Sequence, residues 1–190
     1  MNAEEKIYEA YLKLRSEKLY FNQLKELTKL SNSSLQNVLN KLIKDKSLSI
    51  DKKISNTFYE IKNKKFFSLK FSEIAIKNFE KLDVEIKVPL KNLIEQMPNE
   101  IFTIVFFGSA SRNEHKKDSD IDLLIVDDNK NDFEKIKKDV NSVSNYPISI
   151  FKSTIKQFYE NKDHVIIQAR KTGFPIYREQ NFYEVILNEY

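Results

Sequence analysis

The chain has 190 residues, no cysteine, two histidines and only two glycines, Gly108 and Gly173. Glycines that lie 65 positions apart exclude a Rossmann dinucleotide loop and a P-loop, because each of these phosphate-binding loops needs at least two glycines within about six residues. The lack of cysteine excludes disulfides and Cys/His zinc sites. A bound metal would therefore have to be a hard cation held by carboxylates.

The formal net charge of +4 is unevenly distributed along the chain. Residues 1–70 contain 15 Lys and Arg against 8 Asp and Glu, whereas residues 71–190 contain 17 against 20. A basic first third joined to a mildly acidic remainder is typical of a module that faces nucleic acid and is fused to a second domain. The alternative is that lysine, with 28 residues against 4 arginines, is simply abundant and lies on solvated faces.

The sequence shows no membrane or secretory signal. Its longest apolar run, Ile104–Phe107, is far shorter than the roughly 20 residues of a membrane helix. The N-terminus has neither a basic n-region nor an apolar h-region. We therefore expect a soluble, cytoplasmic protein that does not contact a membrane.

The first 65 residues have the pattern of three helices and a hairpin. Apolar residues recur at helical spacing over residues 7–14 and 21–30. Helix-capping residues at 31–34 precede a third helix that runs to about Asp45. Alternating strand-like stretches follow at 48–52 and 57–61. This order resembles a winged helix-turn-helix domain, which we assign to residues 1–65.

The resemblance implies DNA binding, with the third helix in the major groove and the hairpin against the backbone. The side chains expected to contact DNA are uncharged polar groups and lysines of these two elements: Ser33, Ser34, Gln36, Asn37, Lys41, Lys52 and Lys53. The alternative is a winged helix that serves as a protein–protein or dimerisation module.

Residues 66–85 are expected to form a helical connector, and residues 86–190 a second domain of α/β (α+β) class. Apolar spacing predicts helices at about 74–82 and 90–97, with Pro89 near the start of the latter. The remaining predicted elements are strands at 101–107, 120–126, 146–151 and 174–177, and one helix at 154–172 that Gly173 caps.

One stretch of this second domain carries residues suited to phosphate and metal chemistry. The apolar strand at 101–107 runs directly into Gly108 and Ser109, where backbone can approach a phosphate closely. Asp120 and Asp122 follow ten residues later, at the start of the next strand. Residues two apart on a strand share a face, so both carboxylates project together. Paired carboxylates repel one another unless a divalent cation shares them.

This combination resembles the nucleotidyltransferases of the DNA polymerase β superfamily, whose signature is Gly-Ser, a ten-residue spacer and Asp-x-Asp. The residues that match are Gly108, Ser109, Arg112 and the run Asp118–Leu124. The similarity is greatest to the minimal nucleotidyltransferase domains. It implies a mixed sheet flanked by helices, an NTP as substrate or ligand, and Mg²⁺ or Mn²⁺.

The resemblance also implies roles for individual residues. Gly108 and Ser109 would hold the β- and γ-phosphates, and Asp120 and Asp122 would be the catalytic, metal-binding residues. Arg112 would either hold phosphate or brace the loop.

The sequence departs from the family pattern at two positions. The family carries a third carboxylate on the next strand, where this chain has Ser149. A hydroxyl supplies neither the charge nor a useful pKa. Asp127 and Asp128 are no simple replacement, because they lie about 16–20 Å beyond Asp122 along an extended strand. The second departure is Asn113, where the family often has glycine.

These features support more than one function. The first hypothesis is an enzyme that transfers a nucleoside monophosphate from an NTP to an unknown acceptor, coupled to a DNA-binding winged helix. The alternative is a DNA-binding transcriptional regulator, or an antitoxin-like protein, whose nucleotidyltransferase domain is catalytically degenerate. A homodimer or a complex with a partner protein is compatible with either function.

Overall fold

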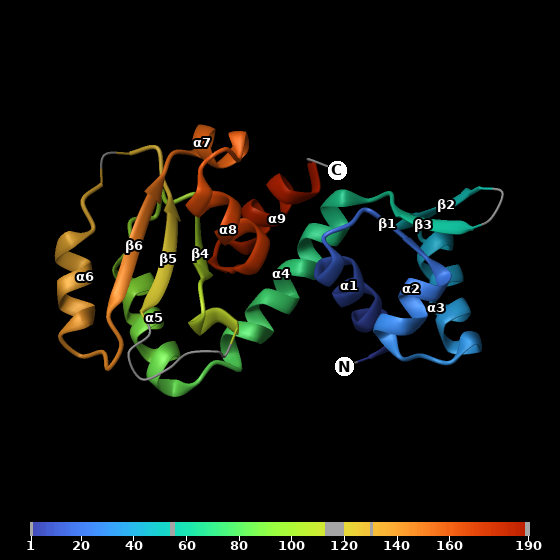
Figure 1. Cartoon of the computed structure of the whole chain (residues 1–190), viewed down its shortest axis with the longest axis horizontal. Coiled ribbons are helices and arrows are strands. Elements are labelled where there is room, and N and C mark those ends of the chain that lie inside the picture. The colour runs from blue at the N-terminus through green and yellow to red at the C-terminus, as the bar shows by residue number, and fades with distance from the viewer. Residues whose placement is uncertain (1, 54–55, 113–119, 130, 189–190) are drawn as a thin grey trace. The chain divides into compact units, whose positions relative to one another are not determined.

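The computed structural model describes residues 2–53, 56–112, 120–129 and 131–188. They form two compact units (Figure 1). Unit 1 comprises Met1–Ile74 together with Tyr183–Tyr190, and unit 2 comprises Ala75–Phe182. Within the described residues, no helix is long and apolar enough to cross a membrane.

Unit 1 is built from short helices and a small antiparallel sheet. Its elements in chain order are α1 (Ala3–Leu14), β1 (Lys18–Tyr20), α2 (Phe21–Thr28), α3 (Asn32–Lys44), β2 (Leu48–Lys52), β3 (Thr57–Ile61) and the first part of α4 (Lys64–Glu80). The sheet order is β1-β3-β2. The helices and the hairpin expected from the sequence are thus present, and the three-residue strand β1 is an addition to them.

Local sequence explains where α3 begins and why the unit holds together. The Ser31 side chain accepts a hydrogen bond from the Ser34 backbone N–H, which caps the helix start. The buried core includes Leu35 and Leu39 of α3. The phenol of Tyr11, which is fully buried, donates a hydrogen bond of 2.8 Å to the Tyr59 carbonyl and so ties α1 to β3.

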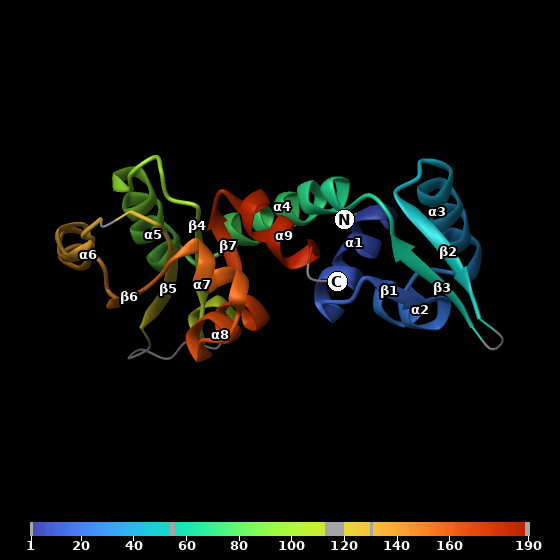
Figure 2. The same ribbon diagram turned by 90° about the horizontal axis from the view of Figure 1, so that it is seen from above.

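Unit 2 contains a mixed four-stranded sheet flanked by helices, as the sequence predicted (Figure 2). Its elements are the rest of α4, then α5 (Val84–Gln96), β4 (Thr103–Phe107), the 3-10 turn η1 (Ala110–Arg112), β5 (Ile121–Val126), α6 (Glu134–Asn141), β6 (Ile148–Ser153), α7 (Ile155–Glu160), α8 (His164–Thr172), β7 (Phe174–Tyr177) and the start of α9 (Glu179–Asn188). The strand order is β6-β5-β4-β7. Strands β5 and β6 are parallel, and the other two pairs are antiparallel.

The side chains of this sheet alternate between two layers of helices. One face carries residues such as Ile104 and Leu123, which pack with α5 and α6 in one apolar cluster. The opposite face carries Phe107 and Asp122, which are cross-strand partners. The end of α8 lies against this second face, since a Cβ at Gly173 would be 2.8 Å from the Phe107 Cβ.

Three helical predictions differ from the structure. The helix expected at about 74–82 is α4, which begins at Lys64 and ends at Glu80, because Phe67 and Phe71 continue its buried face at helical spacing. The single helix expected over 154–172 is two helices, because Asn161 ends α7 in the left-handed region (φ 51°) and the Asp163 side chain caps α8. Helix α5 begins at Val84 rather than near Pro89, which therefore lies in the helix interior. The cost of a proline there is one lost backbone hydrogen bond.

Candidate functional site

The pairing of β4 with β5 brings Gly108 into contact with Asp122. Phe107 pairs with Asp122 across the antiparallel ladder, which places Gly108 beside that carboxylate. A Cβ built on Gly108 would lie only 2.1 Å from Asp122 Oδ2. Gly108 also has a φ of 79°, a backbone conformation that residues other than glycine rarely adopt. Both observations favour glycine at this position.

The residues after Gly108 fold back onto its carbonyl. The Ser111 hydroxyl donates a hydrogen bond of 2.9 Å to the Gly108 oxygen, and Arg112 Nη1 donates one of 3.0 Å to the same atom. The Arg112 backbone N–H donates to the Ser109 carbonyl at 3.1 Å. These hydrogen bonds are compatible with a role for Arg112 in bracing the loop, one of the two roles considered for it. Ser109 is partly exposed beside it.

Asp120 is exposed just before β5, and Asp122 is half-buried within it. Burial first, and the neighbouring charge of Asp120 second, raise the pKa of Asp122 above its usual value. The second of these causes is repulsion between two carboxylates that lie close together. A divalent cation bound by both oxygens would relieve the repulsion.

Ser149 occupies the position where the resemblance called for a third carboxylate. It is the register partner of Asp122 on the parallel strand β6. Its hydroxyl donates a hydrogen bond of 3.0 Å to Asp120 Oδ2. The side chain that faces the two aspartates from β6 is therefore a donor that orients Asp120, and it adds no negative charge.

No other acid within the described residues replaces that missing carboxylate. A search of those residues finds no group of three or more His, Cys, Asp or Glu that could hold a metal ion. Asp127 is buried and accepts hydrogen bonds from the Asn129 backbone N–H and from Asn131 Nδ2. Asp128 accepts from the Ile155 N–H at the start of α7. Both therefore serve the loop and the helix at the other end of β5.

The donor set fits one hard cation held by Asp120 and Asp122. Two carboxylates are suitable ligands for Mg²⁺, which binds proteins through one or two carboxylates and completes its shell with phosphates and water. Gly108 is buried against Asp122, whereas Ser109, the next residue, is partly exposed. Asn113 and Asp118, the other motif positions singled out in the sequence, lie outside the described residues.

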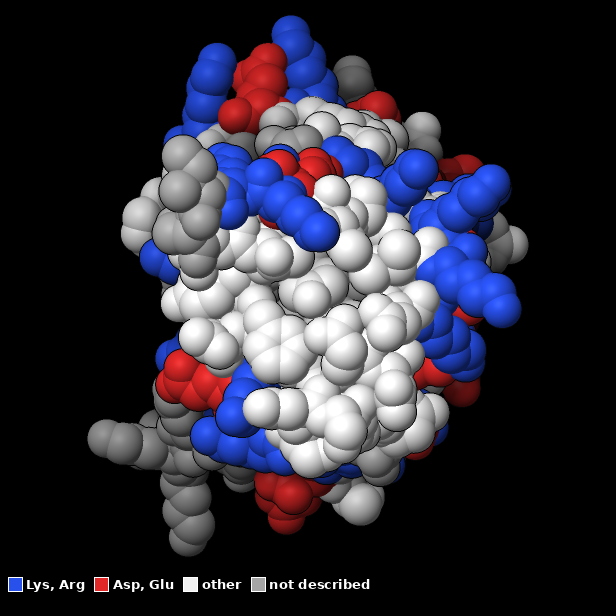
Figure 3. All heavy atoms as spheres, turned by 90° about the vertical axis from the view of Figure 1, so that its right-hand side faces the viewer, with Lys and Arg blue, Asp and Glu red and all other residues white. Residues whose placement is uncertain are grey.

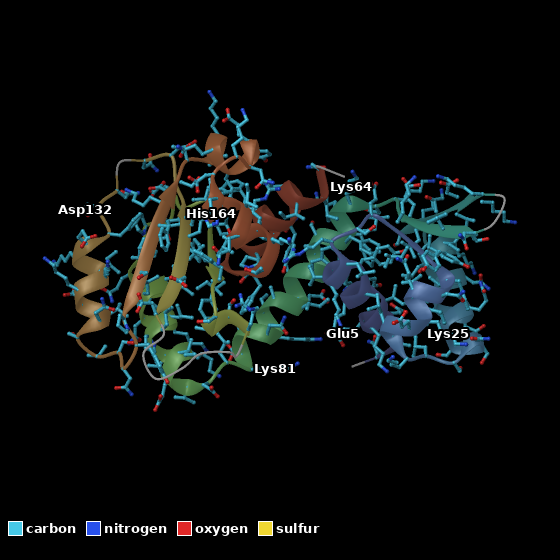
Figure 4. All side chains as sticks on the ribbon, in the orientation of Figure 1. Glu5, Lys25, Lys64, Lys81, Asp132 and His164 are labelled. Atoms are coloured by element: carbon cyan, nitrogen blue, oxygen red, sulfur yellow. The ribbon has the colours of Figure 1, made fainter. Side chains whose placement is uncertain are left out.

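Gly173 contributes more to this region than the helix cap expected from the sequence. A Cβ at this residue would lie 2.7 Å from both the Ala169 and the Phe106 carbonyl oxygens. Gly173 therefore permits close packing of the end of α8 on β4. The nearby histidine of α8, His164, is exposed at the other end of the helix and lies on no part of this site (Figure 4).

Sequence reasoning did not single out the aromatic residues beside the carboxylates. Phe107 directly precedes Gly108, and its ring centroid lies 5.7 Å from that of Phe151 on β6. The ring of Phe107 is buried, whereas Phe151 is 38% exposed. The period-two spacing of Ser149 and Phe151 within the predicted strand 146–151 was the signal that could have identified this pair.

In unit 1, the residues predicted to contact DNA lie on exposed parts of α3 and of the β2–β3 hairpin. Those exposed are Ser33, Gln36, Asn37, Lys41, Lys52 and Lys53, and Ser34 is partly exposed. Figure 3 shows a broad uncharged area on this side of the molecule, with lysine and arginine side chains along its border.

Two of these lysines already have partners within the unit. Lys41 Nζ forms an ion pair with the Glu4 carboxylate of α1. Lys53 Nζ lies 5.6 Å from the centroid of the Phe58 ring. Lys41 is therefore less available to a phosphate than an unpaired exposed lysine would be.

Comparison with known proteins gives one family match and one structural match. No curated protein matches the chain. A chain from a solved structure described as "Crystal structure of the toxin-antitoxin with AMP-PNP" is similar to this chain at 19% sequence identity and a TM-score of 0.43, covering 56% of this chain and 83% of that one. Residues 89–173, which contain the Gly108–Asp122 site, match the family model described as "Nucleotidyltransferase domain".

Proposed function

We propose that the protein is a nucleotidyltransferase-like protein that binds an NTP together with Mg²⁺ or Mn²⁺ and transfers a nucleoside monophosphate to an acceptor. The observation that carries this proposal is the contact between Gly108 and Asp122, where a Cβ would lie 2.1 Å from the carboxylate oxygen. This contact joins the Gly108-Ser109 step to the carboxylate pair within a region that matches a nucleotidyltransferase domain.

Each residue of the site has a defined task in this proposal. Gly108 and Ser109 hold the β- and γ-phosphates, while Asp120 and Asp122 hold the cation. A cation bound there supplies charge neutralisation on the phosphates and on the departing pyrophosphate. The acceptor oxygen forms a bond to the α-phosphorus as the bond from that phosphorus to pyrophosphate breaks, and the proton of the acceptor hydroxyl leaves to water, because Ser149 is too weak a base to take it. Ser149 fixes the orientation of Asp120 through its hydrogen bond.

Incubation of the protein with α-labelled ATP, CTP, GTP or UTP and Mg²⁺ or Mn²⁺ tests the transfer. We expect label to appear on the protein or on a molecule from its cell extract, and to disappear in Asp120→Ala. Asp139→Ala is the matched control, because Asp139 is an exposed acid of α6 on the opposite face of the sheet. Absence of label with all four NTPs would rule out transfer under these conditions, and equal loss in both variants would rule out a specific role for Asp120.

Ser149 favours a second function, in which the nucleotide is bound but not transferred. Its hydroxyl donates to Asp120, and a serine hydroxyl is too weak a base to take a proton from an acceptor molecule. In this reading the protein is a DNA-binding regulator, or an antitoxin-like protein, whose degenerate nucleotidyltransferase domain senses a nucleotide or docks a partner. Unit 1 would act as a winged helix, with the exposed side of α3 against the bases and the hairpin against the phosphates.

Duplex binding measured over a range of salt concentrations tests this second function. We expect Lys52→Ala and Lys53→Ala each to reduce the slope of log K against log salt by about 1. Lys41→Ala should have a smaller effect, because Lys41 is paired with Glu4. Lys162→Ala, at a side chain that is 82% exposed in unit 2, is the control and should leave the slope unchanged. No salt-dependent duplex binding by the unmodified protein would exclude this function.

A further inference from the structure

The strand β6 presents an aromatic residue to the same face of the sheet as the carboxylates. Ser149 pairs with Asp122, and Phe151 pairs with Leu124, in the parallel ladder between β6 and β5. Because side chains alternate along a strand, Asp122, Ser149 and Phe151 lie on one face. β6 is also at the edge of the described sheet, so that this face has no further strand beyond it.

The ring of Phe151 packs against the ring of Phe107 and is partly exposed to solvent. Its ring lies at 56° to that of Phe107, with 5.7 Å between centroids. Phe107 is 3% exposed, so the supporting ring is fixed in the core, whereas Phe151 remains 38% exposed. On the other face of β6, Ile148 is buried and Ile150 is partly buried against the apolar cluster. Phe151 is therefore exposed on the face of β6 that carries Ser149, opposite the face that packs in the apolar cluster.

The position of this ring relative to the carboxylates suits a bound nucleotide. Ser149 Oγ lies 3.0 Å from Asp120 Oδ2. Phe151 is two residues further along β6, which corresponds to about 7 Å on a strand. A nucleotide separates its base from its α-phosphate by one ribose, a comparable span. An α-phosphate over the aspartates therefore leaves the base within reach of the ring.

We propose that Phe151 is the stacking platform for the base of the bound nucleoside triphosphate, so that β6 forms part of the nucleotide site together with Gly108 and Ser109. This inference rests on the proposed function. Aromatic rings bind bases through their faces and do so with little dependence on base identity. An acceptor is the less suitable occupant of this flank, since the side chain beside it, Ser149, is a hydrogen-bond donor to Asp120 and takes no proton.

The absence of tryptophan from the chain allows a direct test. In Phe151→Trp the new residue is the sole tryptophan, and its emission reports on stacking. We expect ATP with Mg²⁺ to quench this emission and inorganic triphosphate with Mg²⁺ to leave it unchanged, because the latter has no base. Tyr159→Trp is the matched control, at an aromatic residue of α7 that is 50% exposed, and its emission should respond to neither ligand.

Affinities from calorimetry complete the test without relying on a probe. Phe151→Ala and Phe151→Leu should each weaken ATP binding about tenfold, which corresponds to the loss of one stacked base, and should bind inorganic triphosphate as the unmodified protein does. Unchanged ATP affinity without quenching would overturn the inference and leave the proposed function standing. Unchanged ATP affinity with loss of transfer would place Phe151 on the acceptor side and would equally overturn it. Failure of the unmodified protein to bind either ligand would instead refute nucleotide binding itself.

Discussion

Replacement of Gly108 by alanine perturbs the candidate site at its tightest contact. Two separate costs follow from the structure. The φ of 79° disfavours any residue with a Cβ by about 1–2 kcal/mol. The new Cβ would also lie 2.1 Å from Asp122 Oδ2, so the carboxylate must move, and an off-rotamer side chain costs about 0.5–1.5 kcal/mol. We expect the free energy of unfolding to fall by roughly 1.5–3.5 kcal/mol, the sum of the two costs.

A double-mutant cycle separates these two costs. In an Asp122→Ala background the oxygen that the Cβ would meet is absent, so Gly108→Ala should cost only about 1–2 kcal/mol. Urea unfolding of the four proteins therefore predicts a coupling free energy of about 0.5–1.5 kcal/mol between the two positions. If Gly108→Ala costs the same in both backgrounds, the contact between Gly108 and Asp122 is refuted, and with it the observation on which the proposed function rests.

Gly173→Ala is the control for this cycle. Its Cβ would meet the carbonyl oxygens of Ala169 and Phe106, both at 2.7 Å, which are backbone atoms that cannot rotate away. The destabilisation should therefore be the same with and without Asp122. Coupling of Gly173 to Asp122 as large as that of Gly108 would show that the cycle reports a general loosening of unit 2.

Three further predictions follow from the same structure. Ser149→Asp would place a third carboxylate beside Asp120 and Asp122, so calorimetry should show tighter Mg²⁺ binding, whereas thermal unfolding without a cation should show lower stability; unchanged Mg²⁺ affinity would contradict the placement of Ser149. Because the folded-state pKa of Asp122 is raised from 3.8, the native state keeps its proton to a higher pH than the unfolded state, so this group lowers stability as pH rises from 3.8 through the raised pKa. Asp122→Asn should remove that part of the pH dependence in urea unfolding and be the more stable protein at neutral pH, whereas an unchanged profile would show that Asp122 carries no such shift. Tyr11→Phe should lower the free energy of unfolding by about 1–3 kcal/mol, since the buried carbonyl of Tyr59 loses its donor; a neutral result would contradict the hydrogen bond.

The elements that sequence patterns predicted best are those whose burial is decided locally. Strands β4 and β5 are almost continuously apolar, and both are buried in the structure. Strand β7 has the predicted bounds, since Gly173 precedes it and ends the helix before it. Wherever a run of apolar residues meets a clear stop residue, the pattern alone determines the element.

The elements that the sequence analysis did not predict have different causes. Strand β1 has three residues and exists because it pairs with β3, more than 35 positions away, which no local pattern reports. Asn161, which adopts the left-handed conformation, and Asp163, the N-cap of α8, could have indicated the break between α7 and α8. The apolar residues on both sides keep helical spacing, so the pattern predicted one helix. Helix α9 has buried apolar residues at helical spacing, among them Phe182 and Val185, and could have been predicted.

The candidate site also has features that the sequence predicts and features that only the structure shows. The contact of Gly108 with Asp122 follows from strand pairing, which the motif spacing implies but does not display. The sequence placed Ser149 opposite the aspartates, and its parallel pairing with Asp122 agrees with that placement. Only the structure shows that the hydroxyl points at Asp120. A parallel register depends on a crossover of many residues and cannot be read from either strand alone.

The scarcity of glycine has a structural explanation in this region. Gly108 directly follows β4 in the chain, and Gly173, at the end of α8, packs against the last two residues of β4. A Cβ at Gly173 would clash with Phe106 and Phe107 of β4. A Cβ at Gly108, which directly follows Phe107, would clash with Asp122. Helix α8, strand β4 and the carboxylate therefore meet with no room for a methyl group. A general need for flexible turns would have distributed glycines among the loops, five of which instead use Arg, Lys or Asn at positive φ. Since the chain tolerates that strain elsewhere, close contact is the stronger reason for glycine at both positions: with the Ala169 and Phe106 carbonyls at Gly173, and with the Asp122 carboxylate at Gly108.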